Sequence, residues 1–95
     1  MAKVLFFEVG QPPRVGEMET TLEALQSYVG GYIEAVTVAT DAALICNEEG
    51  RLLNLPYNRK IFGESIYGPA LIMGVQGDEL VGLTDEQAAV LMRMR

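Results

Sequence analysis

The sequence predicts a small α+β protein in which a mostly antiparallel β-sheet carries two helices packed on one face. Two helix-start signals are present, and short runs of β-branched and apolar residues, separated by glycine and proline, lie around them. The chain has 95 residues, which corresponds to a single domain over residues 1–95. Its hydrophobic fraction of 49% and charged fraction of 21% are typical of a folded protein.

The first expected strand is Lys3–Val9, which is apolar on both faces and therefore suits a strand covered on two sides. Pro12 and Pro13 end it, because proline cannot extend a ladder of hydrogen bonds. The next segment, Arg14–Glu19, is either a connection or a short edge strand.

A helix is expected to follow. Thr20 and Glu23 have the spacing of a capping box, in which each side chain binds the other residue's backbone amide. Leu22, Leu25 and Val29 then recur at helical spacing, and two glycines end the helix.

Two adjacent strands, Tyr32–Thr40 and Ala42–Asn47, are expected in the middle of the chain, joined by a tight hairpin. The following segment, Arg51–Ile61, is interpreted as irregular, because Pro56 keeps its neighbour out of the helical region. We expect Gly63–Tyr67 to be a loop.

The C-terminal part predicts two more strands, Ala70–Val75 and Leu80–Leu83, followed by a second helix. Thr84 and Gln87 form the second capping box. Acids in the first turn and arginines at positions 93 and 95 in the last turn match the helix dipole.

The residue inventory excludes several kinds of chemistry. The chain contains no His and one Cys, Cys46, which rules out histidine bases and ligands, an internal disulfide and a thiolate zinc cluster. Cys46 lies in an apolar strand and is interpreted as a core residue. The paired acids are explained by turns and a helix start, so we expect no catalytic residue, no metal site and no cofactor. No apolar run is long enough for a secretory signal or a membrane span, and together with the unpaired cysteine this favours the cytoplasm.

The charge is unevenly distributed. Seven basic and 13 acidic residues give a net charge of −6, which argues against binding to duplex nucleic acid. The stretch from Glu17 to Glu49 holds seven acids and no base, whereas Arg51–Lys60 holds three bases and no acid. The sequence therefore predicts a local positive spot on an acidic protein.

This basic segment is the candidate ligand-binding site. Arginine fits a phosphate or carboxylate with two parallel hydrogen bonds, asparagine both donates and accepts, and tyrosine can stack on a base. The residues assigned to the site are Arg51, Asn54, Tyr57, Asn58, Arg59 and Lys60. The alternative is that the segment is a solvated loop whose polar side chains cap turns and whose leucines attach it to the core.

Four blocks of the sequence resemble a known family. They are TLEALQSYVGGYI (Thr21–Ile33), ALICNEEGRLLNLPYNR (Ala43–Arg59), GPALIMG (Gly68–Gly74) and LTDEQ (Leu83–Gln87). The chain resembles the small phage, plasmid and bacterial proteins grouped as domain of unknown function 3846. The resemblance implies an accessory protein of a mobile element and brings no catalytic motif. Tyr57 departs from the small residue or proline expected there.

Three functions follow from these observations. The first is a non-enzymatic binding module of a mobile element, a counter-defence sponge that sequesters a phosphorylated or nucleotide-like ligand through the basic segment. The second is an acidic inhibitor or adaptor that binds a basic surface of a host protein. The third and weakest is a small enzyme that uses Arg, Lys and Tyr alone. Self-association as a homodimer or higher homo-oligomer is compatible with each, because a chain this short has a thin core.

Overall fold

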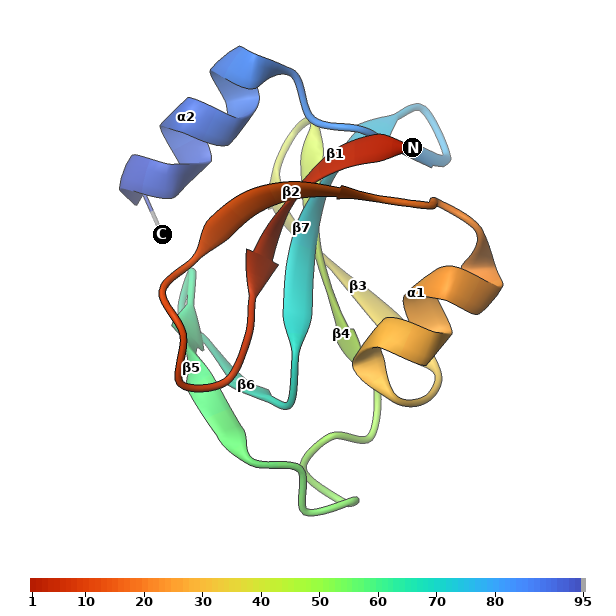
Figure 1. Ribbon diagram of the computed structural model, residues 1–95, viewed down its shortest axis with the longest axis vertical. Coiled ribbons are helices and arrows are strands. Elements are labelled where there is room, and N and C mark those ends of the chain that lie inside the picture. The colour runs from red at the N-terminus through yellow and green to blue at the C-terminus, as the bar shows by residue number, and fades with distance from the viewer. Residues whose placement is uncertain (95) are drawn as a thin grey trace.

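An antiparallel sheet carries most of the chain in the computed structural model, which describes residues 1–94. The elements in chain order are β1 (Ala2–Phe7), β2 (Arg14–Met18), α1 (Leu22–Val29), β3 (Ile33–Ala39), β4 (Ala42–Asn47), β5 (Tyr57–Ile61), β6 (Glu64–Tyr67), β7 (Ala70–Gln76), β8 (Glu79–Val81) and α2 (Asp85–Met94). The main sheet has the strand order β2-β1-β7-β4-β3, with β8 paired to the end of β7 (Figure 1). Strands β5 and β6 form a separate hairpin.

The α+β class and the antiparallel sheet are confirmed, since every strand pair in the described residues is antiparallel. Strands β1, β7 and β4 form the centre of the sheet, and all residues of β4 are buried. The expected strand Ala42–Asn47 has these same bounds. The segment Arg14–Glu19, for which the sequence left two options, forms the edge strand β2.

The two helices lie on opposite faces of the sheet, so the expectation that both pack on one face is wrong. Val4 and Phe6 of β1 belong to a cluster with Leu25 of α1, whereas their neighbour Leu5 belongs to a second cluster with Leu91 of α2. Successive residues of a strand point to opposite faces. Because the central strands are apolar on both faces, each face needs its own cover, and Figure 1 shows α1 and α2 on the two sides.

A threonine caps the start of each helix. In α1 the cap is Thr21 and not the expected Thr20: the Thr21 hydroxyl oxygen accepts a hydrogen bond from the amide of Ala24 at 3.1 Å. In α2 the capping box is confirmed, with Thr84 and Gln87 each accepting a hydrogen bond from the other's backbone amide. The arginine at position 95 lies outside the described residues. Among the described residues, no helix is long and apolar enough to cross a membrane.

The hairpin β5–β6 is the main departure from the expected elements. The expected loop Gly63–Tyr67 contains β6, and the end of the irregular segment Arg51–Ile61 forms β5. The two strands are joined by a two-residue turn, and both turn residues have positive φ, 48° at Phe62 and 84° at Gly63. One buried isoleucine from each strand joins the core cluster on the α2 face. The hairpin therefore helps α2 to cover that face.

Candidate functional site

Two of the six residues assigned to the basic segment hold the fold together. The Asn58 side-chain amide donates to the carbonyl oxygens of Phe7, at 2.7 Å, and of Gly68, at 2.9 Å. Arg59 donates from Nε to the Asn58 side-chain oxygen at 2.7 Å. These bonds attach β5 to the β6–β7 connection and to the end of β1, which is 51 residues away in the sequence.

The guanidinium of Arg59 is bound to backbone carbonyls of the same chain. One terminal nitrogen donates to the carbonyl oxygen of Glu8 at 2.8 Å and also to that of Gln11. The guanidinium carbon lies 5.5 Å from the centre of the Phe7 ring. Arg59 therefore ties the β1–β2 turn to β5, with Nε and one terminal nitrogen bonded within the chain.

The other four residues do not converge on one point. Arg51 and Tyr57 both approach Tyr67: the Arg51 guanidinium carbon is 5.8 Å from the ring centre, and the Tyr57 ring packs edge-on at 5.4 Å. Asn54 is exposed in a left-handed turn conformation with φ of 56°, and Lys60 is exposed on β5. The structure thus brings together the pair Asn58 and Arg59 and, separately, Arg51 and Tyr57.

Two adjoining hollows follow β3 on the α2 face of the sheet, and we call them together the edge groove. The apolar hollow has a volume of about 490 Å³ and is lined by Val38, Ala39, Asp41, Ala42, Phe62, Thr84, Glu86, Gln87, Val90 and Leu91. The polar hollow has a volume of about 670 Å³ and is lined by Glu34, Ala35, Val36, Cys46, Asn47, Glu48, Gly50, Arg51, Gly63, Glu64, Ser65, Ile66 and Tyr67. Phe62 lines the apolar hollow and its neighbour Gly63 lines the polar hollow, so the turn of the β5–β6 hairpin borders both.

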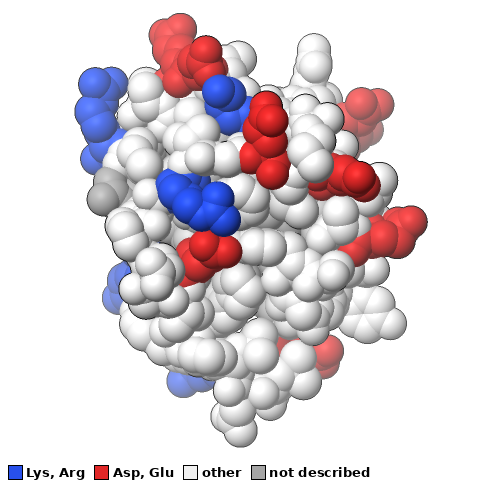
Figure 2. All heavy atoms as spheres, in the orientation of Figure 1, with Lys and Arg blue, Asp and Glu red and all other residues white. Residues whose placement is uncertain are grey.

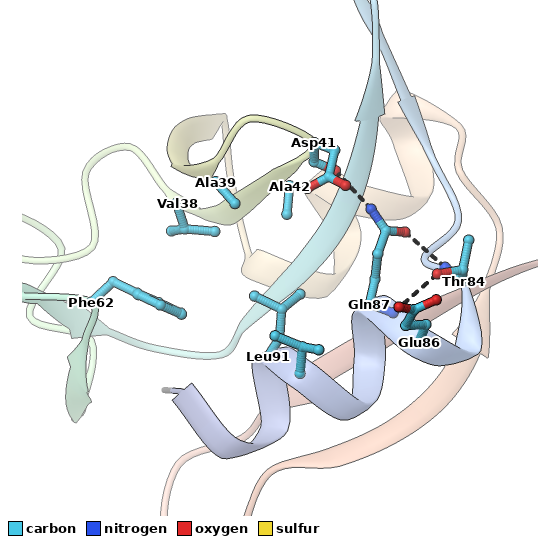
Figure 3. Close-up of a pocket in the computed structure, with 10 residues that line it drawn as sticks. Val38, Ala39, Asp41, Ala42, Phe62, Thr84, Glu86, Gln87 and Leu91 are labelled. Atoms are coloured by element: carbon cyan, nitrogen blue, oxygen red, sulfur yellow. Dashed lines mark hydrogen bonds between the residues drawn. The ribbon is translucent and has the colours of Figure 1, made fainter.

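The walls of the apolar hollow are held in place by hydrogen bonds. Figure 3 shows Leu91 and Gln87 of α2 facing the β3–β4 hairpin, with Phe62 closing the far side. The Gln87 side-chain amide donates to the backbone oxygen of Asp41 at 3.3 Å, and its oxygen accepts from the amide of Thr84 at 2.8 Å. Gln87 therefore ties α2 to the hairpin across the hollow.

Phe62 is held in a conformation that its side chain disfavours. It occupies the first position of a two-residue hairpin turn with φ of 48°, where asparagine or glycine is usual. Such a conformation costs a bulky residue about 1–3 kcal/mol. The ring packs against the core cluster of the α2 face and also lines the apolar hollow. Strain of this kind, maintained by the surrounding structure, is often found at binding sites.

The edge groove is electrostatically negative. Asp41 and Glu86 stand at the apolar hollow, while three glutamates and a single base, Arg51, line the polar hollow. Burial, and then the carboxylates of Glu34 and Glu64, raise the pKa of the Cys46 thiol to about 11. The thiol is therefore protonated at neutral pH and is a poor nucleophile. No group of side chains able to hold a metal ion occurs among the described residues.

The surface charges agree with the negative potential of the edge groove. Figure 2 shows acidic side chains spread over the upper and right-hand parts of one face, whereas the basic side chains are scattered and form no continuous patch there. The positive spot expected from Arg51–Lys60 is dispersed, because Arg59 turns inward to backbone oxygens.

Sequence patterns did not predict the residues that shape the groove, chiefly Phe62, Val38 and the α2 residues Gln87 and Leu91. Gln87 was expected only as a partner in the capping box, a role that it does serve, and Leu91 is part of the core cluster on the α2 face. The one usable signal was the Phe62–Gly63 pair, in which a large aromatic residue precedes a glycine between two β-prone runs.

A family model described as domain of unknown function DUF3846 matches residues 1–95, the whole chain. No curated protein and no solved structure matches the sequence.

Proposed function

The chain belongs to the DUF3846 family, and we propose that it is a non-enzymatic binding module whose edge groove holds an apolar, positively charged segment of a partner protein. The observation that carries the proposal is an apolar hollow of about 490 Å³ with acids at its rim. This is the inhibitor or adaptor function anticipated from the acidic stretch of the sequence.

Burial of apolar surface in the apolar hollow provides the binding energy. Its lining includes Val38, Phe62 and Leu91, and Val90 beside them is 36% exposed. Burying one leucine-sized side chain of a partner there contributes about 1.5–3 kcal/mol. The strained Phe62 turn and the Gln87 bonds hold the hollow open before binding, which lowers the ordering cost of association.

The carboxylates of the edge groove make binding selective for basic segments and speed their association. Asp41 and Glu86 stand beside the apolar surface, and Glu34 and Glu64 continue the negative charge along the groove. A lysine or arginine next to an apolar side chain meets a complementary surface, whereas an acidic segment is repelled. The net charge of −6 extends the same attraction over a longer range.

A second candidate function is sequestration of a phosphorylated or nucleotide-like ligand, as for the counter-defence sponge of a mobile element. One observation favours it: the Arg51 guanidinium lies over the Tyr67 ring at the polar hollow of about 670 Å³, a pairing that suits a phosphate and a base. Glu34, Glu48 and Glu64 line the same hollow and oppose an anion. We therefore rank this function second.

The test uses a random peptide library as the probe. We expect selection on the wild-type protein to enrich peptides that combine Lys or Arg with Leu, Ile or Val, and their binding to weaken with salt. Val90→Lys places a positive charge in the apolar hollow and should raise Kd about tenfold or more. The matched control is Ala89→Lys, an exposed neighbour on the same helix that does not line the hollow.

The second arm measures the melting temperature with linear and cyclic nucleotides and ADP-ribose. We expect no shift. A rise that grows with nucleotide concentration and disappears in Arg51→Ala, combined with a peptide selection that enriches nothing, would overturn the partner-groove function in favour of sequestration.

A further inference from the structure

We propose that the partner segment binds as an additional β-strand, antiparallel to β3, with the side chains of one of its faces in the edge groove. The inference rests on the proposed function, because it specifies how the same groove is occupied. The occupant is an extended, basic segment of another protein. It is recognised by backbone hydrogen bonds to β3 and by alternate side chains that lie along the edge groove.

Strand β3 offers an open edge. It is the last strand in the order β2-β1-β7-β4-β3, and within the described residues it pairs with β4 alone. The carbonyl oxygen of Tyr32 accepts from the amide of Glu48 at 2.9 Å, which fixes the phase of the ladder just before β3. Because hydrogen-bonded and non-bonded pairs alternate in an antiparallel ladder, the backbone groups of Ile33, Ala35 and Thr37 point away from β4.

The outward-pointing backbone groups provide a template for a strand of limited length. The ladder with β4 is regular from Ile33 to Thr37 and then shifts by one residue before Ala39. A bulge of this kind bends the strand and ends regular pairing. The regular part spans about 17 Å at 3.4 Å per residue. The added strand therefore pairs over about five residues.

Side chains of the added strand would reach the edge groove on one face only. Glu34 and Val36 are on the α2 side of the sheet, since their cross-strand partners Cys46 and Leu44 belong to the cluster on that face. Both residues line the polar hollow. An antiparallel neighbour thus places one side chain opposite Val36 and, two residues later, one opposite Glu34.

These two positions differ in chemistry, and the difference defines the sequence of the occupant. Opposite Val36, which packs against the core cluster on the α2 face, an aliphatic side chain is favoured. Opposite Glu34, with Glu48 and Glu64 at the same hollow, a lysine or arginine is favoured. The recognised pattern is therefore an aliphatic residue, any residue, and then a base.

Electrostatics favours a basic segment at this edge over a second copy of the chain. A second copy carries a net charge of −6 and would bring its own acidic β3 against Glu34. An acidic residue on an edge strand opposes self-pairing in this way. The same residue attracts a basic segment, so the edge is closed to copies of the chain and open to a partner of opposite charge.

The test takes the tightest peptide from the random library and measures amide hydrogen exchange of the full chain with and without it. We expect the amides of Ile33, Ala35 and Thr37 to exchange about tenfold more slowly in the complex, because each gains a hydrogen bond. The amides of Glu34 and Val36 already face β4 and serve as internal controls. Unchanged exchange at all three outward amides would overturn strand addition.

A variant pair tests the same point through affinity. Ala35→Pro removes an outward N–H, a place where an edge strand tolerates proline, and should weaken peptide binding about tenfold. Ala35→Thr keeps the N–H and should bind as the wild type does. If Ala35→Pro does not fold, N-methylation of successive peptide amides replaces it, and losses at every second position are expected.

The outcomes separate the two proposals. Binding that is lost in Val90→Lys but shows no outward-amide protection and no alternation on N-methylation leaves the groove as the binding site and removes the added strand. A selection that yields no peptide sensitive to Val90→Lys removes the groove itself. Protection accompanied by a dimer on sedimentation without peptide would show that the edge pairs with a second copy, contrary to the proposal.

Discussion

The basic segment, residues 51–60, and the edge groove differ in what their polar groups do. In the basic segment, Asn58 and Arg59 donate hydrogen bonds to carbonyl oxygens of distant parts of the same chain. In the edge groove, Glu34, Asp41 and Glu86 are exposed, and Asp41 and Glu86 line a hollow with apolar side chains. A cluster of hydrogen-bond donors in a sequence can therefore mark a structural anchor, while a binding surface is assembled from residues far apart.

The largest expected effect is on stability, at the anchor. Asn58→Ala removes the donors to the carbonyl oxygens of Phe7 and Gly68 and the acceptor of Arg59. Leaving such groups without partners should lower the free energy of unfolding by about 2–3 kcal/mol in urea titrations. Lys60→Ala, at an exposed position of the same strand, should change it by less than about 0.5 kcal/mol. An equal loss in both variants would contradict the structural role of Asn58.

Arg59 and Arg51 should differ in how much each contributes to stability. Arg59→Ala removes the hydrogen bonds to the backbone oxygens of Glu8 and Gln11 and should cost about 1.5–2 kcal/mol of stability. Arg51→Ala removes a contact with the half-buried Tyr67 ring and should cost under about 1 kcal/mol. Thermal unfolding of both variants measures this difference, and the reverse order would mean that Arg59 is free for a ligand.

Phe62→Asn should separate binding from folding. Asparagine suits the left-handed turn, so the relief of strain offsets part of the lost packing, and the free energy of unfolding should change by about 1 kcal/mol or less. The apolar hollow loses one wall, so peptide affinity should fall about tenfold. Calorimetric titration and urea unfolding of the same sample test both. Unaltered affinity would remove Phe62 from the groove's function.

The smallest effect concerns the thiol of Cys46, whose pKa is raised to about 11 by burial and then by Glu34 and Glu64. Alkylation at pH 8 should be slow and should accelerate as the pH rises toward that value, because the thiolate is the reactive form. Glu34→Gln should lower the pKa and raise the alkylation rate, whereas Glu79→Gln, on β8, should not. An unaltered rate in Glu34→Gln would mean that the carboxylate of Glu34 does not contribute to the potential at the polar hollow.

Much of the fold was predictable because its signals are local. The capping box at Thr84 and Gln87 depends on residues three apart, and the run Ala42–Asn47 is apolar throughout and ends where the strand does. The cap of α1 was misplaced by one residue because Thr20 and Thr21 are adjacent and chemically equivalent. The structure assigns the cap to Thr21.

The remaining features depend on long-range packing. Strands β5 and β6 were not predicted, for two reasons. Phe62 stands at a turn position where asparagine or glycine is usual, and Pro56 suggests an irregular segment. The placement of the helices on opposite faces required knowledge of which face each strand residue covers. The edge groove combines β3, the Phe62 turn and α2, which are separated in the sequence, and no single motif marks it.

The most direct test of the central account, that a partner binds at the edge groove and not at the basic segment, is an amide chemical-shift map of the chain titrated with the library-selected peptide. Binding at the edge groove predicts shifts that saturate together in β3, α2 and the Phe62 turn, with residues 52–60 unaffected. Shifts centred on residues 51–60 and Tyr67, with β3 and α2 unchanged, would contradict it.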